Sequence, residues 1–257
     1  MCLPPPRVSG RGGRDHFAEI YRQQADREAE WLRRTARPKA DSIVHLLRRS
    51  GLAPHSVLEI GAGTGAVIGA IRSLGVGTLH YAVDFSEHAI QKLHEAEPRV
   101  VAAVADVTET PDPFGSGPYD LGIASHVIEH LEQPGHFLRA LRDVPMGHLV
   151  AEVPLEDLLV GRLKSVVMDR STNAAGHVQF FTRRSFLRLL DRSGWAVHHV
   201  RVYAPVLDAS TLAFSYGQDP PMRRLAKSLT ERWLPQALGP LWTRVYHAHC
   251  TAICTKA

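Results

Sequence analysis

The sequence predicts a doubly wound α/β fold, in which helices cover both faces of a largely parallel sheet. Between residues 57 and 152, short apolar runs alternate with amphipathic segments, as strands and crossover helices do in such a sheet. The apolar runs contain no regular polar alternation, which is typical of strands that are covered on both faces. With 257 residues, the chain can hold one large domain of this kind with small additions.

Seven strands and four helices make up the predicted core of this domain. The strands are expected at residues 57–60, 79–83, 100–104, 119–124, 147–152, 195–203 and 246–255. The helices are expected at residues 65–74, 86–95 and 133–142, and in a segment that Thr182 caps and Gly194 closes. A Pro/Gly-rich loop at residues 108–118 separates the third strand from the fourth.

The rest of the chain adds three parts to this core. Residues 1–14 carry a proline run and a glycine pair, and are expected to be a flexible tail. Residues 15–50 are predicted to form two helices that are split near Pro38 and cover the site. The main domain then spans residues 51–257. Within it, the proline-containing segment at about 205–244 is too long for a hairpin and is expected to form a helical cap.

Composition limits the partners and the location of the protein. The formal net charge is +4 with a pI of about 9.1, but the arginine pairs are scattered, so nucleic-acid binding is not expected. No apolar run approaches the ~20 residues that a membrane-spanning helix needs. Cys250 and Cys254 are expected on one face of a strand, about 13 Å apart. This distance is too long for a disulfide, so reduced cysteines and a cytoplasmic location are predicted.

The most informative segment runs from Val57 to Gly65 and reads Val-Leu-Glu-Ile-Gly-Ala-Gly-Thr-Gly. A buried strand here enters a turn with three alternating glycines, which leave the backbone open to a ligand and allow positive φ angles. Glu59 precedes the turn, where a site for phosphate alone would gain nothing from a carboxylate. Asp84 and Asp106 follow the next two predicted strands, so three acids are expected at one edge of the sheet.

This pattern fits a ligand with a positive group and a nucleoside, as in S-adenosylmethionine (SAM). Asp84 could accept hydrogen bonds from the ribose hydroxyls, and Asp106 from the adenine amine. Each acid alone could instead cap the following helix or loop. The main alternative is a nicotinamide dinucleotide, because residues 61–66 can be aligned with G-x-G-x-x-G/A. Glu59, the position of Gly65 and Asp106 favour SAM over this alternative.

The chain resembles the class I SAM-dependent methyltransferases. Residues 57–65 resemble the first motif of that family, and residues 119–131 resemble its fourth strand and following turn. Residues 176–182, with the helix that ends at Gly194, resemble the branch that includes ubiquinone-pathway and small-molecule O-methyltransferases. The resemblance covers about residues 40–203 and the last strand. It implies a Rossmann-like seven-stranded sheet that is mostly parallel, with one antiparallel strand near the C-terminus.

The resemblance also implies a role for individual residues. Gly61 and Gly63 would approach the methionine part of SAM, and Glu59 would order its ammonium group. Asp84 would hold the ribose, Phe85 would border the adenine, and Asp106 with the Val107 amide would read its edge. Ser125 or His126 would lie beside the sulfonium. The implied cofactor residues are Glu59, Gly61, Ala62, Gly63, Asp84, Phe85, Asp106, Val107, Ser125 and His126.

A second group of residues could bind a metal or move a proton. His126, Glu129 and His130 share one face of a helical turn, and His177 could join them from a distant segment. The group resembles the Glu-x-x-Glu-His and distant His set of magnesium-dependent 2′-O-methyltransferases that act on small-RNA 3′ ends. His126 departs from that set, which weakens the case for Mg²⁺ and leaves Zn²⁺, Fe²⁺, Ni²⁺ or no metal open. Without a metal, His126, His130 or His177 could be the catalytic base, or the cluster could simply satisfy local hydrogen bonds.

Together these features predict a SAM-dependent methyltransferase. The expected reaction is O-methylation of an aromatic or specialised small molecule, in which the acceptor displaces the methyl group from sulfur in line. RNA 2′-O-methylation, protein methylation, N- or C-methylation of a small molecule, and a non-enzymatic binding module are the alternatives. The expected partners are a small-molecule substrate and a second copy of the chain in a homodimer.

Overall fold

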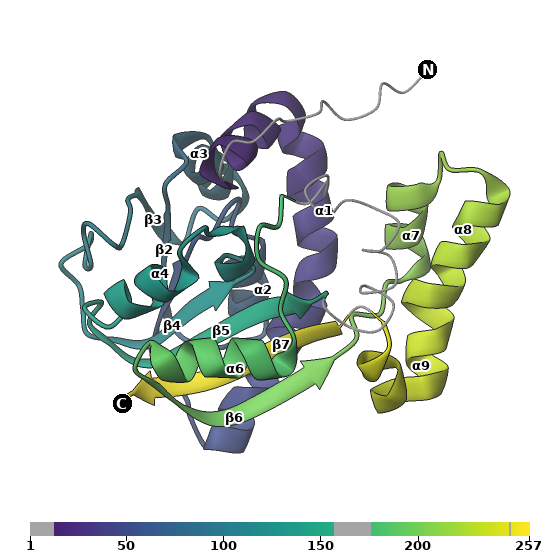
Figure 1. Ribbon diagram of the computed structural model, residues 1–257. Coiled ribbons are helices and arrows are strands. Elements are labelled where there is room, and N and C mark those ends of the chain that lie inside the picture. The colour runs from purple at the N-terminus through teal and green to yellow at the C-terminus, as the bar shows by residue number, and fades with distance from the viewer. Residues whose placement is uncertain (1–12, 157–175, 247) are drawn as a thin grey trace.

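The computed structural model describes residues 13–156, 176–246 and 248–257, and a seven-stranded sheet forms the centre of this part of the chain (Figure 1). The strand order is β3-β2-β1-β4-β5-β7-β6, and β7 is antiparallel to both of its neighbours. The strands are β1 Ser56–Ile60, β2 Leu79–Asp84, β3 Val101–Val104, β4 Tyr119–Ser125, β5 Met146–Leu155, β6 Trp195–Tyr203 and β7 Ala248–Lys256. The predicted fold class is therefore confirmed, including the single antiparallel strand.

Helices cover both faces of the sheet, as the strand pattern predicts. They are α1 Gly13–Ser50, α2 Ala66–Ser73, α3 Glu87–Ala96, η1 Ile128–His130, α4 Pro134–Ala140 and α6 Arg183–Arg192. The helices α1, α2 and α3 share one apolar core with the sheet, whereas α4 and α6 share the other (Figure 1). Thr182 caps α6 and Gly194, with φ +82°, follows it, as expected from the sequence.

The predicted break at Pro38 is wrong, because α1 is one continuous helix of 38 residues. A proline inside a helix removes one backbone hydrogen bond and costs about 3 kcal/mol. The residues around Pro38 offset this cost by burying a full apolar stripe against the sheet and α2, so tertiary packing overrides the local signal. The stripe consists of Ala36, Ala40, Ile43, Leu46 and Leu47.

The segment between β6 and β7 is helical, as expected for residues 205–244. It contains α7 Ala209–Tyr216, α8 Pro221–Ser228, η3 Leu229–Trp233, α9 Leu234–Leu238 and η4 Gly239–Arg244. These helices stand beside the sheet, and α7 contacts α1 (Figure 1). Arg34 on α1 donates a hydrogen bond to Ser210 and lies 4.9 Å from the centre of the Phe214 ring. The predicted tail at residues 1–14 lies almost entirely outside the described residues.

Strand order also fixes where a ligand can bind. The chain proceeds from β1 outward to β3 and then returns to the other side of β1 with β4. In an open α/β sheet, the crevice at such a reversal, beyond the carboxyl ends of the strands, is the usual ligand site. Gly61, Asp84 and His126 directly follow or end β1, β2 and β4, so they meet at this edge. None of the helices in the described ranges could cross a membrane.

Candidate functional site

The glycine turn that follows β1 lies close to the start of the loop that follows β4. Gly61 and Gly65 have φ angles of +69° and +78°, which favour glycine. A Cβ atom on Gly61 would lie 2.5 Å from a methyl group of Val127, and one on Gly65 would lie 2.7 Å from Leu93. The two positions therefore need glycine for their conformation and for the space that they leave.

A cleft opens at the reversal point of the sheet, beyond the carboxyl ends of β1, β2 and β4. Six of the ten predicted cofactor residues line it, and His130 and Phe137 line it as well. The six are Gly61, Asp84, Phe85, Asp106, Val107 and His126.

Backbone amides hold the two aspartates of this cleft in place. The Asp84 carboxylate accepts hydrogen bonds from the amides of Gly63 (2.8 Å) and Ser86 (2.9 Å). Asp106 accepts from the amide and the hydroxyl of Thr108, at 3.0 and 2.7 Å. Burial raises the pKa of Asp84, although the Ser86 and Gly63 amides oppose this by stabilising the charged form. Both carboxylates are therefore oriented by the chain itself.

The other four predicted cofactor residues do not line the cleft. Glu59 is 2 % exposed, and its carboxylate accepts a hydrogen bond from the Ile68 amide in α2 at 2.8 Å. Ala62, Gly63 and Ser125 are not in the cleft lining. The Ser125 hydroxyl is buried and has no hydrogen-bond partner among the described atoms. Glu59 thus anchors the helix that follows the glycine turn, which is the capping alternative considered for each acid.

Burial of Glu59 predicts an unusual dependence of stability on pH. Burial raises its pKa from 4.5 to about 8, against the opposing effects of the Ile68 amide and Lys39. Between these values the folded protein keeps a proton that the unfolded chain releases, so the free energy of unfolding falls as pH rises, by up to about 1.4 kcal/mol per pH unit. Glu59→Gln retains an acceptor for Ile68 but cannot ionise. We expect this variant to exceed wild type in stability near pH 8.

Urea denaturation without SAM, at about pH 5 and about pH 8, measures this difference. The stability advantage of Glu59→Gln over wild type should shrink toward the lower pH, because as the pH approaches 4.5 the unfolded chain also keeps the Glu59 proton. A difference between the two proteins that is the same at both pH values would contradict a protonated Glu59 in the folded state.

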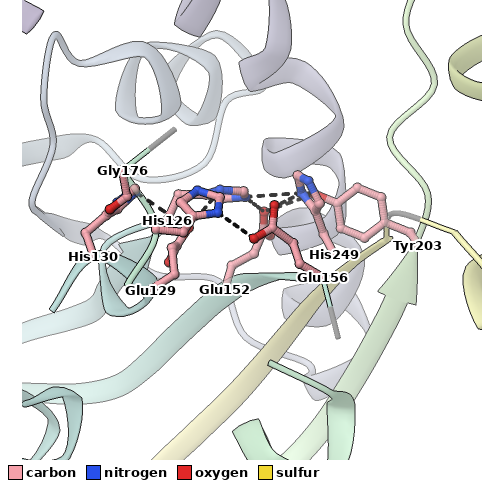
Figure 2. A network of polar contacts seen from close by, with 9 residues as sticks. His126, Glu129, His130, Glu152, Glu156, Gly176, Tyr203 and His249 are labelled. Atoms are coloured by element: carbon pink, nitrogen blue, oxygen red, sulfur yellow. Dashed lines mark hydrogen bonds and ion pairs between the residues drawn. The ribbon is translucent and has the colours of Figure 1, made fainter. Parts of the chain in front are cut away.

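The four predicted metal or catalytic residues separate into two adjacent clusters. Figure 2 shows His126 between Glu129 on one side and His249 with Glu152 on the other. Its Nδ1 atom lies 3.1 Å from Glu129 Oε1, and its Nε2 atom lies 3.2 Å from His249 Nδ1. The backbone of His126 is left-handed, with φ +58°, which is strained for a residue other than glycine. This conformation places the His126 imidazole between Glu129 on one side and His249 with Glu152 on the other.

Glu129, His130 and His177 form the first cluster. His130 Nδ1 lies 3.2 Å from the Gly176 carbonyl oxygen, and its Nε2 lies 3.9 Å from Glu129 Oε1. His177 Nδ1 lies 2.6 Å from a carboxylate oxygen of Glu156. The Glu129 carboxylate is fully buried and accepts no hydrogen bond of good geometry from the described residues, yet three imidazoles surround it.

The electrostatics of this cluster keep Glu129 ionised and His130 neutral. Burial alone would raise the pKa of Glu129, but the facing His126, His130 and His177 hold it well below its usual range. Burial lowers the pKa of His130 to about 4, although the Glu129 charge opposes this change. At neutral pH a neutral imidazole, His130, therefore lines the cleft, and the ionised Glu129 carboxylate is buried beside it.

Comparison with known sequences decides the family. The sequence profile of the methyltransferase domain matches residues 27–200, from α1 into β6. The chain belongs to the methyltransferase domain family. It is a SAM-dependent methyltransferase, and the cleft is at the place where this fold binds its cofactor. No curated protein sequence matches the chain.

Solved structures share the fold of this methyltransferase at low sequence identity. The magnesium protoporphyrin IX methyltransferase of Synechocystis with bound SAM has a TM-score of 0.57 and 12 % identity, over 97 % of this chain and 100 % of that chain. A SAM-dependent methyltransferase of Thermotoga maritima, a possible histamine N-methyltransferase, has a TM-score of 0.57 and 13 % identity, over 94 % of this chain and 100 % of that chain. A Haloferax volcanii methyltransferase in complex with the Trm112 activator has a TM-score of 0.58 and 14 % identity, over 96 % of this chain and 99 % of that chain. These likenesses concern the fold alone.

Three residues that surround His126 are missing from the sequence prediction. Glu152 on β5, His249 on β7 and Tyr203 on β6 meet His126 and form the second cluster (Figure 2). A fourth overlooked residue, Lys39 on α1, is buried and acts electrostatically on His126 and His249. One signal was available, because Glu152 is a lone acid within the apolar run Leu149–Val153. Tyr203 and His249 meet Glu152 only through the order of the strands in the sheet, which the sequence does not show.

Proposed function

We propose that this methyltransferase transfers the SAM methyl group to the hydroxyl oxygen of a small aromatic or specialised metabolite. The observation that carries the proposal is that His130, a neutral imidazole, lines the same cleft as Asp84 and Asp106. Bound SAM and the proton acceptor His130 could therefore act on the same methyl-acceptor molecule. The apolar neighbours in the lining, such as Phe85 and Phe137, suit rings rather than extended polar chains.

In this proposal, SAM lies along the edge of the sheet beyond β1, β2 and β4. Asp84 would accept from the ribose hydroxyls, and Asp106 with the Val107 amide would bind the adenine, which Phe85 borders. The methionine part would pass over Gly61 and Gly63. The orientation of Asp84 by two backbone amides supports this role, because a fixed acceptor loses little freedom on binding.

The chemical step would be a single in-line displacement. The acceptor oxygen attacks the methyl carbon, the carbon–sulfur bond breaks, and neutral S-adenosylhomocysteine leaves. The acceptor proton passes to His130 Nε2, while the Gly176 carbonyl fixes the opposite nitrogen as the protonated one. Glu129, 3.9 Å from Nε2, then stabilises the imidazolium. His126 and His177 would orient Glu129 and are the other candidates for the base.

We further propose that α1 and the helices between β6 and β7 form the acceptor side of the site. Lys39 on α1 acts electrostatically on His126, and the contacts of Arg34 join α1 to α7. A cytoplasmic location is also part of the proposal, supported by the free, buried thiols of Cys250 and Cys254.

The proposal is tested with SAM that carries tritium in its methyl group and a panel of hydroxylated aromatic compounds. We expect label transfer to an organic-soluble ether, and a loss of about 10²- to 10⁴-fold in kcat for His130→Gln with little change in the SAM affinity. His136→Gln, an exposed histidine on α4, is the matched control and should retain full activity.

The product structure separates the alternatives. Methylation at nitrogen or carbon would contradict the proposed acceptor atom. Label in RNA, with an affinity that falls steeply with salt, would contradict the small-molecule assignment. Full activity of His130→Gln would exclude His130 as the base.

A further inference from the structure

We propose that His126, Glu152 and His249 form a binding site for one divalent transition-metal ion, with Zn²⁺ as the ion that fits best. The site differs from the set that the sequence suggested, because Glu152 and His249 replace Glu129, His130 and His177 as partners of His126. Each of the three residues follows or belongs to a different strand, namely β4, β5 and β7.

The distances between the three ligand atoms match a tetrahedral site. His126 Nε2 lies 3.2 Å from His249 Nδ1, and each of these nitrogens lies 3.4 Å from Glu152 Oε1. Zinc binds imidazole nitrogen and carboxylate oxygen at about 2.0–2.1 Å, so neighbouring ligand atoms in a tetrahedron are about 3.3–3.4 Å apart. The three atoms are therefore spaced as a single ion at their centre would require.

The surroundings orient these ligands as outer partners do in metal sites. The far nitrogen of His126, Nδ1, faces the buried Glu129 carboxylate at 3.1 Å, as in carboxylate–histidine–zinc arrangements. Glu152 Oε1 accepts a hydrogen bond from Tyr203 (3.0 Å), and Oε2 accepts from Thr251 (2.7 Å). Thr251 in turn pairs with Ser42 of α1 at 2.8 Å. His126 and Glu152 are thus held in place by neighbouring side chains.

The charge and the backbone of the cluster also favour a cation. Glu129 and Glu152 are both fully buried, and both lie beside His126. The strained, left-handed backbone of His126 directs its Nε2 atom to this point. Without an ion, the two facing nitrogens must share a proton, and a divalent ion would replace that proton.

The neighbouring cluster is a poorer metal site. His130 Nε2 lies 3.9 Å from Glu129 Oε1, which exceeds the spacing for a tetrahedral ion. Its other nitrogen lies near the Gly176 carbonyl, and His177 Nδ1 is paired with Glu156. Mg²⁺ would also be a poor fit for the second cluster, because that ion prefers six oxygen ligands.

Three protein ligands are the usual number for a zinc ion that keeps one position open for water or substrate. His126 also lines the cofactor cleft, so the ion would lie beside the proposed acceptor. In that respect only, the inference rests on the proposed function. An acceptor hydroxyl or water at the open position would lose its proton more readily.

The test uses the full chain, stripped of metal with a chelator and then titrated with Co²⁺. We expect a single equivalent to bind, to show the intense visible absorption of four-coordinate Co²⁺, and to be displaced by Zn²⁺. His249→Gln should weaken Zn²⁺ binding by at least about 100-fold, since even an outer-shell partner is worth about 10- to 100-fold. His177→Gln, in the neighbouring cluster, is the matched control and should keep the wild-type affinity.

The outcomes separate this inference from the proposed function. Absence of the Co²⁺ bands in wild-type protein would overturn it without reference to any variant. Loss of Zn²⁺ binding in His177→Gln, with retention in His249→Gln, would also overturn it, because the ion would then be in the other cluster. SAM affinity, measured by calorimetry on the same samples, checks that the variants fold and reports on the cofactor site independently.

Discussion

Replacing Asp84 by alanine is expected to abolish SAM binding. The carboxylate is oriented by Gly63 and Ser86, and the proposed ribose hydroxyls would complete its hydrogen bonds. The variant would lose the ribose acceptor and would also release the Gly63 amide that shapes the glycine turn. Each hydrogen bond to a charged group contributes about 1.5–3 kcal/mol, so two such losses weaken binding by more than about 100-fold. Isothermal titration with SAM measures the effect.

Asp143→Ala provides the control for Asp84→Ala. Asp143 is exposed and precedes β5, at the edge of the sheet opposite the cleft, so its loss should leave SAM affinity unchanged. Asp84→Asn adds a finer comparison, because the amide retains one acceptor oxygen but not the charge. Wild-type SAM affinity in Asp84→Ala would contradict the position proposed for the cofactor in this cleft.

The second large effect is expected from Gly61→Ala, which should destabilise the protein and weaken SAM binding together. The new methyl group would lie 2.5 Å from Val127, and the residue would still need a φ angle of +69°. Overpacking costs about 1–3 kcal/mol, and a left-handed conformation adds roughly 1–2 kcal/mol for a residue other than glycine. Thermal and urea denaturation, with calorimetry for SAM, measure both consequences.

Gly75→Ala separates strain from steric clash. Gly75 has a similar φ angle of +73°, but no atom lies within 4 Å of the position that its Cβ would take. Gly75→Ala should therefore lose only the stability that the left-handed backbone conformation costs, and it should leave SAM binding intact. Adding Val127→Ala to Gly61→Ala should restore part of the lost stability. Equal destabilisation by Gly61→Ala and Gly75→Ala would show that Val127 does not restrict the turn.

The sequence predicts most of the sheet because the strands and crossover helices carry strong, local signals. The run from Val57 to Gly65 contains a buried strand, three glycines and an acid within nine residues, and the structure places a strand, a tight turn and α2 there. Asp84 and Asp106 follow the same logic, since residues that end adjacent parallel strands meet at one edge. These inferences need no knowledge of distant contacts.

The errors arise where distant residues compete with local signals. Pro38 locally predicts a break, but the burial of the apolar residues of α1 keeps the helix continuous. The hydrogen bond that Glu59 accepts from the Ile68 amide, nine residues later in α2, is likewise not visible in the local sequence. His249 and Glu152 are 97 positions apart in the sequence numbering, and only the order of β5 and β7 brings them together.

The position of β7 between β5 and β6 sets an order of assembly during synthesis. Every residue proposed to hold the nucleotide precedes β5, so that half can form while later segments are still emerging from the ribosome. The cluster around His126 must wait for β7, which follows all other strands along the chain. A nascent chain would therefore acquire its cofactor pocket well before the proposed metal site, which needs His249 on β7.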